Sequence, residues 1–123
     1  MRQRVKNVCY LATSVIETGG EKRDIPICAL PAGAEVMEVS VEVLEDTTGG
    51  NSQCVIGTEE NNALFLNLVD INSTANRHTS SVKYTTPKPL AININLTANK
   101  ATTAGKIKVR VLYFVPSEIM VEY

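Results

Sequence analysis

The sequence is poor in the residues on which much protein chemistry depends. Its 123 residues include no Trp and only one His, and the three cysteines, Cys9, Cys28 and Cys54, form no CxxC pair. A disulfide framework usually has an even number of cysteines, and a zinc site needs further ligands at close spacing. We therefore expect all three cysteines to be buried free thiols with no metal bound.

Neither sign of charge is in excess. The chain has 12 basic and 13 acidic side chains, for a net charge of -1. A nucleic-acid-binding domain usually has a marked basic excess, so no nucleic-acid partner is expected. No apolar run reaches the ~20 residues that span a bilayer, so no membrane partner is expected either. In the start, MRQRVKNVCYLATSVI, Thr13 and Ser14 interrupt the apolar stretch, which favours a strand over a secretory signal.

Motifs for catalysis are also missing. His78, in ANRHTSS, lies near Asp70, Ser80 and Ser81 in the sequence, but no GxSxG elbow accompanies them. We expect a solvent-exposed loop histidine rather than a member of a hydrolase triad.

Glu59 and Glu60, followed by two asparagines, leave open a glycosidase or calcium role. Their spacing does not match an EF-hand loop, and a solvated turn is the better interpretation. The sequence thus predicts no catalytic residue, no metal ligand and no cofactor, and the protein is not expected to be an enzyme.

What the sequence does contain is alternation of apolar and polar residues. In PAGAEVMEVSVEVLED, at 31–46, the apolar set Met37, Val39, Val41 and Val43 alternates with Glu38, Ser40 and Glu42. This period of two predicts a strand with one buried and one wet face. The strand candidates are 5–16, 25–30, 35–45, 52–57, 63–71, 81–85, 90–97 and 106–115.

These segments predict an all-β fold. About seven or eight strands separated by polar turns every 8–12 residues are typical of a sandwich or barrel. Pro26 confines its segment to an edge or a strand start. A short helix within 60–71 remains an alternative to a strand, and 72–81 (NSTANRHTSS) is expected to be an exposed loop. We expect one domain over 1–123, with 1–6 as an extended arm.

Two basic stretches have no assigned chemistry, one in MRQRVK and one on the last strand candidate. Both fit the wet faces of strands, where lysines also discourage aggregation. The alternative is a positive strip for an acidic protein partner. With the basic residues of ANRHTSS, the candidate interface residues are Arg2, Arg4, Lys6, Arg77, His78, Lys106, Lys108 and Arg110.

Three stretches, in their order along the chain, resemble small head proteins of tailed bacteriophages. They are LPAGAEVMEVSVEVLED at 30–46, CVIGTEENNALF at 54–65 and TTAGKIKVRVLYF at 102–114. In that family a Pro-Ala-Gly turn comes directly before a Val-rich strand, and a TAGK turn precedes the last strand, which ends in an aromatic residue. The 72–81 segment is less like the family pattern.

The resemblance implies a jelly-roll-like β-sandwich that serves as a capsid decoration, or cement, protein. Such proteins bind the outer surface of the virion, often as homotrimers, and hold neighbouring major capsid proteins together. The chain would be made and assembled in the cytoplasm of the host bacterium. The alternative is a tail-fibre or host-receptor module that binds a glycan, although the six aromatic residues without Trp offer no clear sugar platform.

Overall fold

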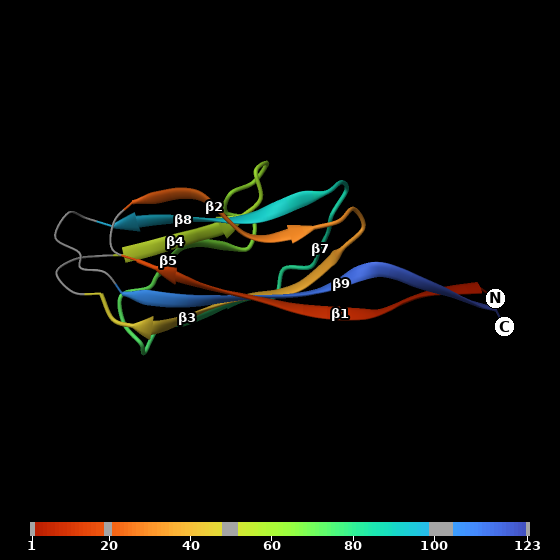
Figure 1. Cartoon of the computed structure of the whole chain (residues 1–123), viewed down its shortest axis with the longest axis horizontal. Helices are drawn as coiled ribbons and strands as arrows, with labels where there is room; N and C mark the ends of the chain where they lie inside the picture. Colours follow the sequence, from red (N-terminus) through yellow and green to blue (C-terminus); the bar gives the residue numbers. More distant parts are fainter. Residues whose placement is uncertain (1, 19–20, 48–51, 99–104, 123) are drawn as a thin grey trace.

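The computed structural model describes residues 2–18, 21–47, 52–98 and 105–122, and the side chains of 9–18, 21–47, 52–97 and 105–115. Two antiparallel sheets pack against each other, and the described residues contain no helix (Figure 1). The predicted all-β sandwich is therefore confirmed. Its strands are β1 (Arg2–Glu17), β2 (Lys22–Leu30), β3 (Glu35–Glu45), β4 (Ser52–Gly57), β5 (Leu66–Asp70), β6 (Arg77–Ser80), β7 (Tyr84–Thr85), β8 (Leu90–Ala98) and β9 (Lys106–Glu122).

The strand order is that of a jelly roll. The first sheet, sheet A, has the order β1-β9-β3-β6, with β7 also paired to β3. The second sheet, sheet B, has the order β2-β8-β4-β5. Strands from both ends of the chain are thus neighbours in each sheet, as in double Greek-key sandwiches. Pro26 lies on β2, an edge strand, as predicted.

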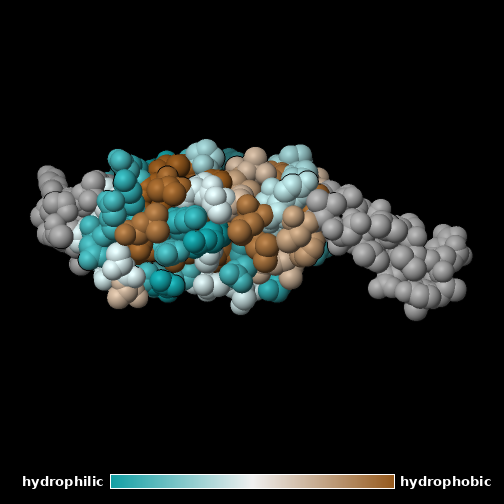
Figure 2. All heavy atoms as spheres, turned by 60° about the horizontal axis from the view of Figure 1, so that its bottom comes forward, coloured by the Kyte–Doolittle hydropathy of each residue, from teal (hydrophilic) through white to brown (hydrophobic). Residues whose placement is uncertain are grey.

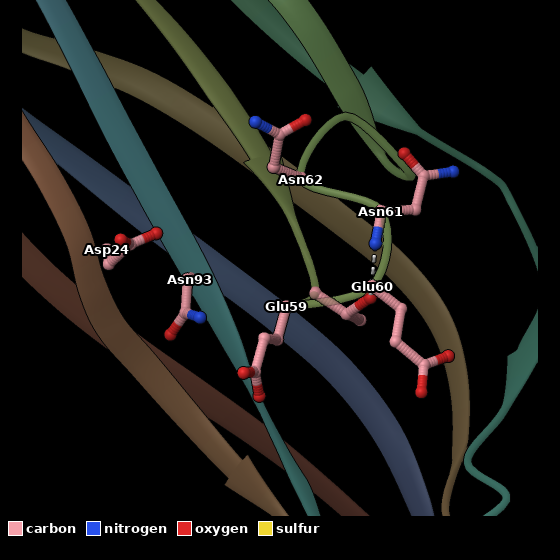
Figure 3. A pocket seen from close by; sticks show the side chains of 7 residues that line it. Asp24, Glu59, Glu60, Asn61, Asn62 and Asn93 are labelled. Atoms are coloured by element: carbon pink, nitrogen blue, oxygen red, sulfur yellow. Dashed lines mark hydrogen bonds between the residues drawn. The ribbon is translucent and has the colours of Figure 1, made fainter.

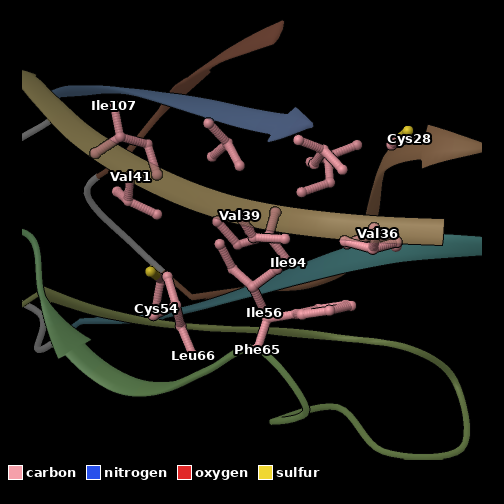
Figure 4. Packing of buried hydrophobic residues seen from close by; sticks show 14 of the residues in the cluster. Cys28, Val36, Val39, Val41, Cys54, Ile56, Phe65, Leu66, Ile94 and Ile107 are labelled. Atoms are coloured by element: carbon pink, nitrogen blue, oxygen red, sulfur yellow. The ribbon is translucent and has the colours of Figure 1, made fainter. Parts of the chain in front are cut away.

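Alternation decides which side chains fill the space between the sheets. Ile92, Ile94 and Leu96 of β8 face Ile107 and Val109 of β9 across one continuous core, all at most 1% exposed. Figure 4 shows Val39 and Val41 of β3 on the side of the strand that faces Cys54 and Ile56 of β4. Burial of each such side chain contributes about 1.5–3 kcal/mol, so these central strands carry much of the stability.

The predicted core face of β3 is wrong at one position. Val39, Val41 and Val43 are buried, but Met37 is half-buried and Val36 takes its place in the core at 0% exposed. The pairing with β9 shifts between Val36 and Glu38, which is the mark of a β-bulge. One extra residue reverses the alternation, so the first part of β3 presents the other set of side chains to the core.

Two further predictions are corrected. The segment 72–81 is not wholly a loop, because β6 lies within it and pairs Arg77 with Glu42 and Ser80 with Val39 of β3. Cys28 and Cys54 are buried as expected, but Cys9 is an exposed free thiol. The segment 63–71 contains strand β5 and no helix.

β1 and β9 continue beyond the two sheets as a two-stranded ribbon. Their pairing runs from Glu17 opposite Lys106 to Arg2 opposite Glu122, with an irregularity between Lys6 and Val8. β3 reaches only as far as the pair Glu35–Phe114. In Figure 1 the ribbon, formed by 2–8 and 115–122, projects from one end of the sandwich with both termini at its tip. Residues 2–6 of the expected N-terminal arm are thus paired with 118–122 of β9.

Candidate functional site

The predicted basic strip of β9 lies on the outer face of sheet A. Lys106, Lys108 and Arg110 are half-buried there, because alternate residues of β9 point into the core. Arg77 of β6 joins the same face, since it pairs with Glu42 of β3, which in turn pairs with Lys108. The fold therefore brings together four of the candidate interface residues from two separate segments.

Acidic side chains of β3 neutralise this strip within the same chain. Arg110 Nη1 donates to Glu42 Oε2 over 2.7 Å, and Lys106 Nζ lies 3.6 Å from Glu45 Oε1. The hydrogen bond from Arg110 lowers the pKa of Glu42, and the nearby charges of Arg77 and Lys108 lower it further. This face therefore presents charges of both signs rather than a purely positive surface.

His78 joins the edges of the two sheets. It lies on β6 and is half-buried, not a solvent-exposed loop residue as predicted. Its Nε2 lies 2.6 Å from the backbone oxygen of Asp70 on β5. A carbonyl oxygen only accepts, so Nε2 carries the proton and donates. This contact gives His78 a structural role at the edge of the sandwich.

Three candidate residues lie in the ribbon. The register places Arg2 opposite Glu122, Arg4 opposite Met120 and Lys6 opposite Glu118. Their side chains lie outside the described part of the chain, so an interface role for them stays a prediction.

The Glu59–Glu60 turn borders an open hollow of about 640 Å³. It is lined by Asp24, Thr58, Glu59, Glu60, Asn61, Asn62 and Asn93. Figure 3 shows the Glu59 and Glu60 carboxylates directed away from each other, and Glu60 forms an ion pair with Lys88 at 3.3 Å. Thr58 Oγ1 accepts a hydrogen bond from the backbone N–H of Asn61 at 3.2 Å, which closes the turn. The site is consistent with the solvated turn that the sequence predicts.

The side chains that the structure describes include no group of three or more His, Cys, Asp or Glu residues arranged to hold a metal ion. Nor does any helix in the described ranges have the length and apolar character needed to cross a membrane.

Apolar side chains reach the surface at positions outside the predicted interface residues. Figure 2, which brings the lower side of Figure 1 forward, shows hydrophobic patches separated by hydrophilic surface. Leu11 and Val15 of β1 are 58% and 59% exposed. The signal in the sequence is that Leu11–Ala12 and Val15–Ile16 are adjacent apolar pairs, so both faces of this strand carry apolar residues.

An aromatic pair lies on the other face of β1 and β9, where Tyr113 packs against the core. Tyr10 of β1 stacks on Tyr113 of β9, with ring centroids 5.6 Å apart and an angle of 19° between the planes. Tyr10 is 48% exposed. The pair lies near the end of the sandwich from which the ribbon leaves, since Tyr113 also pairs with Val36 near the start of β3.

No protein-family model and no curated protein matches this sequence. Among solved structures, the chain is similar to a chain in the acid-stable capsid structure of Helicobacter pylori bacteriophage KHP30, with a TM-score of 0.81 and 31% identity over 100% of both chains. It also resembles a chain in the capsid asymmetric unit of cyanophage Pam1, with a TM-score of 0.69 and 18% identity over 88% of this chain and 85% of that one.

The second similarity concerns the fold alone. The first spans both chains completely and extends to the sequence. It agrees with the resemblance carried by the Pro-Ala-Gly turn and the closing strand. The chain belongs to a family of capsid-associated structural proteins of bacteriophages.

Proposed function

We propose that this protein is a non-enzymatic decoration, or cement, protein that binds the outer surface of a phage head and stabilises contacts between major capsid proteins. The observation that carries the proposal is the full-length similarity to a chain of the KHP30 capsid structure. In this proposal the protein is made in the bacterial cytoplasm and acts as a homotrimer on the virion.

A homotrimer would attach through three equivalent contacts at once. Multivalent attachment raises overall binding by about 10²–10⁴ over a single contact without any new type of contact. Since the outer face of sheet A carries charges of both signs, its contacts would be specific in position rather than a general attraction to acidic surfaces.

The ribbon formed by 2–8 and 115–122 is proposed to lie on the capsid or on a neighbouring subunit. It projects beyond the sandwich, and each of its strands has one edge without a partner among the described pairings. Such edges can add to another sheet. Because 2–6 pair with 118–122, removal of 1–6 alone would leave the C-terminal strand unpaired, so the test needs removal of both strands.

The test uses capsids that lack this protein. Purified full-length chain is added to them, and both the bound amount and the temperature of capsid disruption are measured. We expect stoichiometric binding and a higher disruption temperature, with less of both for the variant that lacks 1–8 and 116–123. The Glu59→Gln change, at the turn beside the open hollow, serves as a matched control. No binding by the full-length chain would reject the cement role, and full binding by the truncated variant would reject the role of the ribbon.

A glycan-binding module of a tail fibre or receptor-binding protein is the second candidate. One observation favours it: Tyr10 is 48% exposed and stacks on Tyr113, and sugars pack on aromatic faces. A Tyr10→Ala variant that loses binding to a glycan array, while keeping its capsid occupancy, would support this candidate.

A further inference from the structure

Exposed large apolar side chains gather at two opposite edges of the sandwich. Six such residues are exposed among the described side chains, and five of them lie at an edge. The β1 edge comprises Leu11 and Val15, on the outer face of sheet A, and Tyr10, on the other face of the same strand. The β5–β6 edge comprises Leu68 of β5, 52% exposed, and Val82, 40% exposed, which follows β6. The sixth is Leu44, on the outer face of β3.

Each of the two edges includes an outer strand of sheet A. β1 and β6 are the outer strands of sheet A, and in the described residues each pairs with one strand only. β5 is the outer strand of sheet B on this side, and it contacts β6 of sheet A through the hydrogen bond between His78 and the backbone oxygen of Asp70. The β5–β6 edge is therefore the side of the sandwich opposite β1.

The edges also lie at the same height along the strands. One row across sheet A runs from Val15 through Lys108 and Glu42 to Arg77. Another runs from Ala12 through Val111 and Val39 to Ser80. β6 thus spans the same rows as 12–15 of β1. A rotation about an axis parallel to the strands brings the β1 edge of one copy level with the β5–β6 edge of the next.

The charges beside the edges are complementary in sign. Glu17, exposed at the end of β1, is acidic, and Arg77, exposed at the start of β6, is basic. Both lie at the end of the sheet away from the ribbon, because Glu17 pairs with Lys106 and Arg77 lies in the row of Lys108. The same rotation therefore brings Glu17 of one copy level with Arg77 of the next.

We propose that copies of this chain associate head to tail, with the β1 edge of one copy packed against the β5–β6 edge of the next, so that a closed ring forms. The occupant of each edge is a second copy of the chain. Two different patches on one chain are what a heterologous interface requires, whereas a two-fold dimer uses a single patch twice. The inference rests on the proposed homotrimer and assigns its interface.

Three variants test the interface. Leu11→Glu with Val15→Glu changes the β1 edge. Leu68→Asn with Val82→Glu changes the opposite edge, with Asn chosen because Leu68 has a φ of 50°, a backbone conformation that Asn tolerates. Leu44→Glu is the matched control, an exposed apolar residue at neither edge. Circular dichroism verifies that each variant is folded.

Light scattering of the purified chains provides the readout. We expect three times the mass of one chain for the wild type and the Leu44 control, and the mass of one chain for either edge variant. An equimolar mixture of the two edge variants still holds one intact pair of edges, so it is expected to form a two-chain complex and no ring. A monomeric wild type would overturn the proposal, as would loss of association in only one of the edge variants.

The same variants separate this inference from the capsid role. We expect a monomeric edge variant to bind capsids about 10²-fold more weakly than the wild type, since it loses multivalent attachment. A wild-type ring that fails to bind capsids would reject the cement role and leave the interface standing. Capsid binding by a wild type that is monomeric both in solution and on the capsid would reject the proposed interface and leave the cement role standing.

Discussion

The guanidinium of Arg110 on β9 donates to the carboxylate of Glu42 on β3 over 2.7 Å, between residues 68 positions apart in the chain. The acidic face of the strand at 35–45 and the basic face of the last strand are therefore partners within one molecule. Arg110 and Glu42 are 33% and 27% exposed, so water screens the pair only in part. The strip that the sequence offers to an outside partner is largely occupied by its own chain.

The first prediction concerns pH. Arg110 lowers the pKa of Glu42, so the stability that the pair contributes is present above the ordinary pKa of a glutamate and is lost as the pH falls through the lowered value. We expect Glu42→Gln to lower the melting temperature at neutral pH, and the difference from wild type to vanish in strong acid. Glu38→Gln, on the same strand but opposite Leu112, is the control. A gap that widens toward acid would contradict the assignment.

The second prediction concerns a buried hydroxyl that holds the turn before β3. Thr86 Oγ1 accepts from the Ala34 amide at 2.9 Å and donates to the Pro31 oxygen at 2.7 Å, and the residue is 2% exposed. Thr86→Val keeps the shape and removes both of these hydrogen bonds, leaving the Ala34 amide and the Pro31 oxygen only their 3.3 Å hydrogen bond to each other. A loss of about 0.5–1.5 kcal/mol in the free energy of unfolding is expected. Denaturant titration measures it, with the exposed neighbour Thr85→Val as the control. Equal effects of the two changes would show that the hydroxyl does not hold the turn.

The third prediction concerns the core. Ile94 of β8 is 0% exposed, on a strand with partners on both sides. Ile94→Ala removes buried methyl groups and leaves a cavity, so the free energy of unfolding is expected to fall by about 2–5 kcal/mol. Leu44→Ala, at a position 39% exposed, is expected to stay within about 0.5 kcal/mol of wild type. Comparable losses at the two sites would place Ile94 outside the core.

The fourth prediction concerns the thiols. Cys9 is exposed, whereas Cys28 and Cys54 are buried. Burial raises the pKa of Cys54 to about 12 and also raises that of Cys28, so both stay protonated and unreactive at neutral pH. An Ellman titration is expected to detect one thiol in the folded chain and three after denaturation.

The concentration dependence of that titration links it to the proposed ring. Cys9 lies on β1 beside Leu11, so ring formation at the β1 edge is expected to slow its reaction as the protein concentration rises. The β1-edge variant, Leu11→Glu with Val15→Glu, should react at one rate at all concentrations. Rapid reaction of two thiols in the folded wild type would contradict the burial of Cys28 or Cys54.

Several strands could be predicted from the sequence almost to the residue. The segments 35–45 and 52–57 match β3 and β4, and 90–97 matches β8 within one residue. Their alternation has a period of two, and that period alone fixes which side chains can share a buried face. β6 was missed because its four residues, Arg77–Ser80, include no large apolar side chain, and only the neighbouring β3 makes this segment a strand.

By itself, the sequence determined that the chain is built of strands with alternating apolar and polar residues and that Val39, Val41 and Val43 fill its core. Only the tertiary structure decided which faces meet. The bulge that places Val36 rather than Met37 in the core depends on the register of β3 with β9. The pairing of Glu42 with Arg110 depends on two strands from distant parts of the chain becoming neighbours. Strand pairing joins segments far apart in sequence, so the local alternation of residues does not predict which strands pair or in which register. The same holds for the exposed edges, because a strand becomes an edge only through the order of the sheet.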